Sequence, residues 1–504
     1  MTAEAMASQA DGRSDDLAHL SAREVLRRFA RRDLAPSEYL EQLLERIDAD
    51  AEAEPPVNAF TEVLRDQARR EARAADDHYA AGSGTAEGDG RRLVGLPVAT
   101  KEKHALAGRT LSQGMAAYAD EIAGEDHPVV QRLRRHGGVI HARTTSPEFS
   151  CATFTHTRLW GVTRNPWDRS LSPGGSSGGA AAALAAGLTP LATASDIAGS
   201  TRLPASFTGV VGYKGPYGSV PGVGPFAADW YRGDGAMGRT VGDVALLTEV
   251  IRGVHPADHA TVPTQAVPSA DADRAPDDLR GRRIAYSAAL GDYPVQRSVR
   301  EQVDAAVLAM EQAGAEIVEV SPPWMTSEIR ETTMAHFGHI LAEGMSRLLA
   351  GREETAEDYT LRFIADARAH ARRLSLFETL EREAAMQAQL ATVMEGADVL
   401  VTPTSAVLAL PAEARCLDGL TVPDVASGGD RHVEHYWEAH MTVPFNVANR
   451  CPVLSVPAGV ARGVPVGLQI VGHPYDESTV FDVAARFEQI RPWRHWRPPA
   501  PDDV

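Results

Sequence analysis

Three short segments of the sequence carry side chains suited to nucleophilic chemistry. Residues 172–179 read SPGGSSGG and run into an alanine-rich stretch, so small hydroxyls and backbone N–H groups can converge ahead of a helix. Residues 196–204 read DIAGSTRLP and place Ser200 in a turn of small residues after an apolar run. In a sheet protein this is where ligands bind, and the amides of 197–200 are positioned to form an oxyanion hole.

Lysine is the scarcest charged residue of the chain. Among 50 Lys and Arg residues, only Lys101, Lys103 and Lys214 are lysines. A lysine can be neutral near pH 7 whereas an arginine cannot, so each retained lysine is a candidate base. Lys101 ends the apolar run that begins at Val94, and such surroundings lower the pKa of an ammonium group. We expect Lys103 to be structural and assign no chemistry to Lys214.

Competing motifs fail on their context. Residues 174–178 match the nucleophile elbow G-x-S-x-G, but that motif needs a preceding strand, and residues 165–173 contain two prolines. A phosphate-binding loop would need a lysine after the glycines. The histidines between His432 and His440 do not form H-E-x-x-H, and solvated or pocket-lining histidines are the better interpretation. We therefore predict neither a metal nor a cofactor.

Composition restricts the class of protein. The 504 residues carry a net charge of −18, which argues against binding nucleic acid or an anionic membrane. The first thirty residues lack the apolar core of a signal peptide, and the apolar stretch 180–198 is interrupted by Gly187 and Pro190. Three scattered cysteines exclude a disulfide framework. These features predict a cytoplasmic enzyme that uses neither nucleic acid nor a membrane as a partner.

Apolar runs alternating with helical patterns predict an α/β fold. We expect a single large domain, residues 91–504, with a mixed, mostly parallel β-sheet flanked by helices on both faces. Residues 1–90 read as an N-terminal helical extension, with its third helix at about 60–79 and a loop at 82–90. Within the domain, 256–278 reads as an exposed connection and 327–395 as amphipathic helices near the pocket. The expected strands are 93–100, 139–142, 191–195, 283–287, 315–320, 398–402, 453–456 and 467–471.

Taken together, these motifs resemble those of the amidase signature family. Lys101, Ser176 and Ser200 lie 75 and 24 residues apart, the separations found in that family. Further family-like segments from residue 91 onward are Asn165–Trp167, Gly209–Lys214, Met237–Thr240, Asp398–Thr404 and Gly467–Gln469. The family fold is the mixed-sheet α/β domain expected above.

The resemblance implies a role for each motif residue. Ser200 corresponds to the nucleophile, Ser176 to a bridging serine that follows a cis peptide bond, and Lys101 to the general base. The implied oxyanion hole is the turn made of Ile197, Ala198, Gly199 and Ser200. Ala198 departs from the usual glycine there, which restricts the turn to backbone angles that a Cβ tolerates. By ungapped alignment, Ser150 corresponds to a residue that contacts substrate.

The implied activity is hydrolysis of a carboxylic amide to an acid and an amine or ammonia, through a serine acyl-enzyme. The partner would be a small-molecule amide, and we leave a homodimer open as the assembly. A carbamate or ester hydrolase remains an alternative, because the same chemistry serves those bonds. The glutaminase and transamidase subunit of glutamyl-tRNA amidotransferase is disfavoured by Leu203, where that subunit typically has Gln. The complete residue set disfavours a catalytically idle amide-binding protein. We expect specificity to reside in 327–395 and 428–444.

Overall fold

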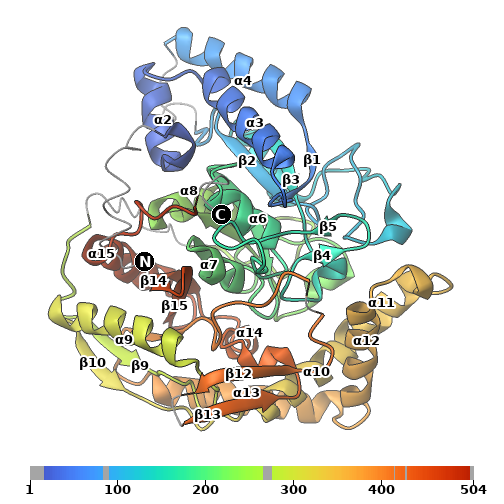
Figure 1. Cartoon of the computed structure of the whole chain (residues 1–504), viewed down its shortest axis with the longest axis vertical. Helices are drawn as coiled ribbons and strands as arrows, with labels where there is room; N and C mark the ends of the chain where they lie inside the picture. The colour runs from blue at the N-terminus through green and yellow to red at the C-terminus, as the bar shows by residue number, and fades with distance from the viewer. Residues whose placement is uncertain (1–15, 83–89, 265–274, 414, 426–427, 500–504) are drawn as a thin grey trace.

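One long sheet forms the centre of the protein (Figure 1). The structure is a computed structural model that describes all residues except 1–15, 83–89, 265–274, 414, 426–427 and 500–504. Within that part of the chain the sheet has eleven strands. In spatial order they are β1 (Phe60–Val63), β3 (Val139–Thr144), β2 (Pro97–Lys101), β6 (Leu191–Asp196), β8 (Gly233–Gly238), β7 (Val211–Lys214), β14 (Val453–Ala461), β15 (Val464–Gly472), β11 (Val399–Pro403), β9 (Arg283–Tyr286) and β10 (Glu316–Glu319).

The sheet is mixed, as predicted, but it is not mostly parallel. Parallel pairing joins β2 to β3 and β6, and β9 to β10 and β11. In the described chain the six remaining pairings are antiparallel. The prediction failed because β7 and β8 went unrecognised and β14 and β15 form a long hairpin, which adds antiparallel neighbours to the middle of the sheet.

Helices cover both faces of the sheet, as the sequence predicts. Gly212 and Tyr213 are adjacent in β7 and face opposite sides. A Cβ at Gly212 would meet α7 (Arg202–Thr208), whereas the Tyr213 ring packs on Phe481 of α15 (Glu477–Ile490) with 4.8 Å between ring centroids. Other helices against the sheet or its covering layers are α5 (Pro128–Arg135), α6 (Gly178–Ala185), α8 (Val241–Ile251) and α9 (Arg297–Gln312).

The N-terminal segment is helical with one exception. It contains α2 (Ala22–Arg31), α3 (Pro36–Glu52) and α4 (Arg65–Ala80). The first four residues of the helix predicted at 60–79 instead form β1, which pairs antiparallel with β3 at the edge of the sheet. The apolar and β-branched side chains of Phe60, Thr61 and Val63 suit this edge position. The loop expected at 82–90 lies almost entirely outside the described residues.

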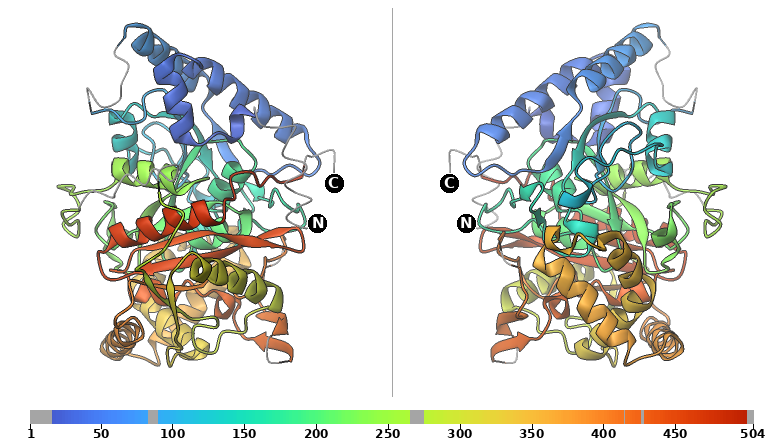
Figure 2. Two further views of the ribbon diagram at one scale, coloured as in Figure 1. Left: turned by 90° about the vertical axis from the view of Figure 1, so that its left-hand side faces the viewer. Right: turned by 90° about the vertical axis from the view of Figure 1, so that its right-hand side faces the viewer.

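A second helical layer, which includes helices predicted for 327–395, lies at the end of the molecule opposite the N-terminal helices (Figure 2). It consists of α10 (Thr326–Ile340), α11 (Ala342–Leu349), α12 (Asp358–Ala371), α13 (Leu376–Val393) and α14 (Pro444–Val447). Beside it lies the hairpin of β12 (Leu420–Val425) and β13 (Gly429–Val433), and a smaller pair is β4 (His156–Thr157) with β5 (Gly161–Val162). Short 3-10 turns are η1 (Leu17–His19), η2 (Ala116–Tyr118), η3 (Glu148–Ser150), η4 (Pro225–Ala228), η6 (Glu353–Thr355) and η7 (Tyr436–Ala439).

The described residues also bear on two other predictions from the sequence, the exposed connection and the absence of a membrane span. In the connection 256–278, residues 256–264 and 275–278 form neither helix nor strand and none is buried; the rest lies outside the described part. No helix of the described residues has the length and apolar character needed to cross a membrane. The cytoplasmic location and the homodimer stay predictions.

Candidate active site

The three predicted site residues meet at the carboxyl ends of two neighbouring strands of the sheet, β2 and β6. Because β2 and β6 are parallel neighbours, their carboxyl ends lie side by side, which brings Lys101 next to the turn that carries Ser200. Ser176 lies in the loop that leads into α6. The N–H of Ser177 donates to the carbonyl of Ser200 at 3.1 Å and joins the two loops. Sequence spacing alone does not fix this arrangement.

Lys101 is fully buried among three serine hydroxyls. Its Nζ lies 2.7 Å from Ser176 Oγ, 3.0 Å from Ser177 Oγ and 3.1 Å from Ser195 Oγ. The Ser177 hydroxyl donates its own hydrogen to the carbonyl of Ser195, so it must accept from Lys101. A neutral amine has two hydrogens and one lone pair. If the neutral amine donates to Ser177 and Ser195, its lone pair accepts from the hydroxyl of Ser176; the protonated amine would instead donate to all three hydroxyls.

The surroundings favour this neutral form. Burial lowers the pKa of Lys101 well below its ordinary value, and the positive charge of Lys103 lowers it further. Asp234 acts in the opposite direction, and its charge is shared with Lys103 and two histidines. Within the described chain no carboxylate forms an ion pair with Lys101. Lys101 can therefore act as a base.

Ser176 follows a cis peptide bond, Gly175–Ser176, as the family resemblance implies. A Cβ at Gly175 would collide with the backbone of Phe154, so only glycine fits there. Ser200 is 3% exposed and faces the same cavity as Ser176. Its hydroxyl makes no hydrogen bond to any described residue, so it is free to meet a substrate carbonyl.

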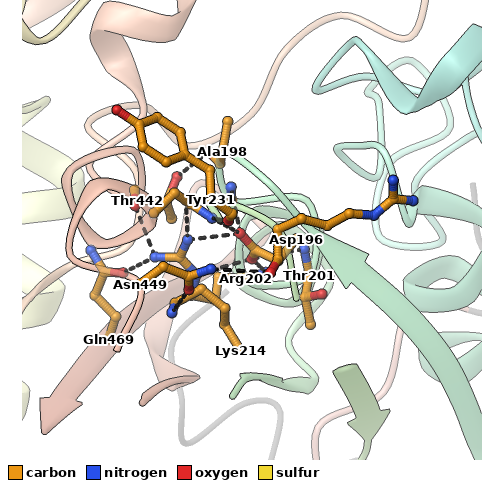
Figure 3. A network of polar contacts seen from close by, with 12 residues as sticks. Asp196, Ala198, Thr201, Arg202, Lys214, Tyr231, Thr442, Asn449 and Gln469 are labelled. Carbon is orange, nitrogen blue, oxygen red and sulfur yellow. Dashed lines mark hydrogen bonds and ion pairs between the residues drawn. The ribbon is translucent and has the colours of Figure 1, made fainter. Parts of the chain in front are cut away.

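The turn after β6 is held in place by hydrogen bonds to Asp196 (Figure 3). Asp196 accepts from the N–H groups of Gly199 at 2.8 Å and Thr201 at 3.1 Å, and it pairs through both oxygens with Arg202. Burial opposes the charge on Asp196, but Arg202 holds its pKa below the ordinary value. The amide of Gly199 is thus occupied, which removes it from the expected oxyanion donors. In the described chain the amides of Ile197, Ala198 and Ser200 have no such acceptor.

Arg202 extends this support to distant strands and loops (Figure 3). Its guanidinium also donates to the carbonyl of Thr442 at 3.0 Å, to Gln469 Oε1 at 3.1 Å and to Asn446 Oδ1 at 2.7 Å. The hydroxyl of Thr442 in turn donates to the carbonyl of Ala198 at 2.8 Å. The charges of Asp196 and Arg202 are paired with each other and hydrogen-bonded, so the network fixes the turn. Single hydrogen bonds of this network join residues up to 267 positions apart in the sequence.

A cavity of about 370 Å³ opens onto Ser176 and Ser200. From the 327–395 segment, its lining includes Phe337 of α10, Leu341 between α10 and α11, and Phe363 of α12; Trp437 contributes from the 428–444 segment. Ser150 lines the cavity as well, with a left-handed backbone angle φ of 59°. Phe337, Leu341, Phe363 and Trp437 therefore make one wall of the cavity largely apolar. The cavity has room for an aryl or alkyl group against this wall.

Charged and titratable residues form another part of the cavity lining, called here the charged wall, and the sequence did not predict them as site residues. Lys103, His127, Arg232 and Asp234 all line the cavity. Lys103 Nζ donates to Asp234 Oδ1 at 2.7 Å. Lys103 was expected to be purely structural, and Asp234 lies in the glycine-rich β8, which carries no strand pattern. The only sequence signal was the retention of a lysine at 103.

Three side chains at or behind the charged wall hold metal-ligating atoms close together: His127 and Asp234, which line the cavity, and the buried His104. Asp234 already binds the ammonium of Lys103, which would repel a cation. His127 accepts from the N–H of Val129 through Nδ1 at 3.2 Å, so its neutral ring carries its proton on Nε2, which faces Asp234. The donor set fits a hydrogen-bonded cluster better than a metal site. The expected lack of a metal stays a prediction.

Known proteins similar to this chain match it over nearly its whole length. The sequence model of the Amidase family matches residues 38–481. An acylamidase from Rhodococcus erythropolis is 33% identical over 497 residues, covering 95% of this chain and 97% of that protein. One component of the glutamyl-tRNA(Gln) amidotransferase of Synechococcus sp. (strain CC9605) is 33% identical over 488 residues, covering 91% and 93%.

Solved structures with the same fold include a bacterial aryl acylamidase of the amidase signature family. It superposes with a TM-score of 0.82 at 24% identity, covering 94% of this chain and 96% of that one. A 6-aminohexanoate cyclic dimer hydrolase with bound substrate gives 0.79 at 25% identity, covering 96% and 99%. These likenesses match the fold inferred from the sequence.

Proposed function

The chain belongs to the amidase signature family and is a hydrolase of carbon–nitrogen bonds in amides, and from this premise we propose that it cleaves an acyl amide through an ester on Ser200. The observation that carries the proposal is the 2.7 Å contact between Ser176 Oγ and Lys101 Nζ, a fully buried amine whose surroundings favour its neutral form. In that form the lone pair of the lysine has one partner, the hydroxyl of Ser176.

The proposed path of the proton runs from Ser200 to Ser176 and then, along the 2.7 Å contact, from Ser176 to Lys101. Lys101 accepts the proton of Ser176 while Ser176 Oγ takes the proton of Ser200, whose oxygen bonds to the amide carbon. The carbonyl oxygen becomes an oxyanion, which the free N–H groups of Ile197, Ala198 and Ser200 stabilise; one such donor is typically worth about 3–4 kcal/mol. The relay returns the proton to the amide nitrogen, the carbon–nitrogen bond breaks, and the amine leaves. Water then cleaves the ester by the same path and releases the acid.

The apolar wall supports an acylamidase rather than a glutaminase. Phe337, Leu341, Phe363 and Trp437 match a hydrocarbon or aryl group better than the polar side chain of glutamine. The Rhodococcus relative is named for the same class of activity. Carbamates and esters form the same acyl-enzyme, so they belong in the substrate panel.

The test is hydrolysis of a panel of anilides, alkyl amides, carbamates and glutamine by the purified chain, with Ser200→Ala and Lys101→Arg beside it. We expect turnover of neutral anilides, and a loss of about 10³-fold or more in kcat/KM for both folded variants. Lys101→Arg is informative because arginine keeps the charge but cannot give up its proton. Near-normal turnover by either variant would overturn the assignment.

A further inference from the structure

One cation of the cavity has no partner among the described residues. Arg232 immediately precedes β8, is half-buried and lines the cavity that contains Ser200. Its guanidinium forms no hydrogen bond or ion pair with any side chain or carbonyl of that part of the chain. Other interior arginines of the site, such as Arg202, have every direction of the guanidinium occupied. An arginine with five free donors facing a cavity is an unused binding group.

The neighbouring charges leave the positive charge of Arg232 uncompensated. Asp234, the acidic residue on the same wall, binds Lys103 at 2.7 Å and faces His104 at 3.1 Å. Burial lowers the pKa of His104 to about 4, so this ring is neutral near pH 7. Lys101 is neutral by the argument above. This end of the cavity therefore carries one net positive charge in a chain whose total charge is −18.

Arg232 is held close to the reacting groups by the register of the sheet. Gly233 pairs with Asp196 and Asp234 pairs with Ser195 across β8 and β6. Arg232 is therefore one residue beyond the pair that starts the Ser200 turn. Its carbonyl is fixed by Asn449 Nδ2 at 3.1 Å, which anchors the backbone while the side chain stays free. Arg232 and Ser200 thus line the same cavity from adjacent segments of the sheet.

We propose that Arg232 binds a carboxylate of the substrate, so that the preferred substrates are amides with a carboxylate at one end and an apolar group at the other. The proposal rests on the amidase activity argued above and adds the substrate class. A planar guanidinium matches a carboxylate through two parallel hydrogen bonds, and partial burial strengthens such a pair. The apolar wall formed by Phe337 and Phe363 lies in the same cavity and receives the hydrocarbon part.

The test compares substrates that differ only in charge. Pentanoyl, glutaryl and 5-aminopentanoyl 4-nitroanilides place a methyl, a carboxylate or an ammonium at the end of chains of similar length. Butyranilide and 4-(butyrylamino)benzoate make the same comparison on the amine side. The readout is the ratio of kcat/KM for the carboxylate and its neutral partner. This ratio is unaffected by a general loss of catalytic power.

We expect the wild type to favour a carboxylate in one of the two series by about 10-fold or more, and to disfavour the ammonium compound. Arg232→Gln should reduce that preference to about unity. Arg280→Gln is the matched control, since Arg280 is exposed, its side chain pairs with Asp278, and neither residue lines the cavity. In the Ser200→Ala background, calorimetry should show the same loss of carboxylate affinity with Arg232→Gln, independent of turnover.

The two proposals fail differently. If the wild type hydrolyses neutral anilides but prefers no carboxylate in either series, the assignment of Arg232 is wrong and the amidase activity stands. A preference for the ammonium compound, or an unchanged ratio in Arg232→Gln, would also overturn the assignment. If no amide is hydrolysed, the proposed function itself fails.

Discussion

The charge of Lys103 should set the pH at which activity appears. Lys101 works only when neutral, so activity falls as the pH drops through its pKa. Lys103 is two residues away and, after burial, is the largest cause that lowers this pKa. Lys103→Met removes that positive charge and also leaves Asp234 without its ammonium partner. Both changes favour protonated Lys101, so the acid limb of the kcat/KM profile should move to higher pH.

The size of the shift follows from Coulomb's law. Lys103 lies in the turn that follows β2, so its Cα is at most about 7 Å from that of Lys101. At an effective dielectric constant of ~20, unit charges at that separation interact by about 2 kcal/mol. This energy corresponds to roughly 1.5 pKa units.

The assay is kcat/KM against pH for a neutral anilide, with Lys103→Arg as the control that keeps the charge. Lys103→Arg should leave the acid limb close to that of the wild type, while Lys103→Met moves it by more than about one unit. An acid limb that does not move, or that moves to lower pH in Lys103→Met, would refute the reasoning. A general loss of stability in Lys103→Met would lower the melting temperature and kcat/KM but would not move the acid limb of the pH profile.

Two further predictions concern the groups that hold the cavity in place. Asp196→Asn should destabilise the fold by about 3–5 kcal/mol and reduce activity, because it leaves Arg202 buried without its counter-charge; unchanged thermal and urea unfolding would contradict this. For His336, burial opposes the charged form, but hydrogen bonds to Asp229 and Glu383 outweigh it and raise its pKa. A raised pKa gives stability that is full below about pH 6 and is lost at higher pH, so His336→Gln should cost more unfolding free energy at about pH 5.5 than at about pH 9; an equal cost would argue against a charged histidine.

The fold was predictable where apolar runs were continuous. The strands β2, β6 and β11 are short, buried apolar segments, and the sequence pattern placed each within a few residues. Strand β8 reads GDGAMG and has no alternation or β-branched residues, so local propensity could not reveal it. It is a strand because β6 and β7 hydrogen-bond to both of its edges. Tertiary pairing, absent from any local window, decided its conformation.

The candidate site was predictable to the same extent. Lys101, Ser176 and Ser200 lie in segments whose composition is unusual by itself, and the spacing matched a family. Asp234 and Arg232 have no local signature, because their importance depends on the register of β8 against β6. The hydrogen bond from the Gly199 N–H to Asp196 was likewise not predicted, because the backbone conformation of the turn, and not the residue types alone, places the two groups together.

The most direct test of the account is to identify the residue that becomes acylated. A fluorophosphonate or an activated carbamate, followed by tryptic mass spectrometry, should give one adduct on Ser200 in the wild type. The adduct should be absent in Ser200→Ala and form at least about 100-fold more slowly in Lys101→Arg. An adduct on Ser176, on another serine, or at an undiminished rate in Lys101→Arg would contradict a relay from Ser200 through Ser176 to a neutral lysine.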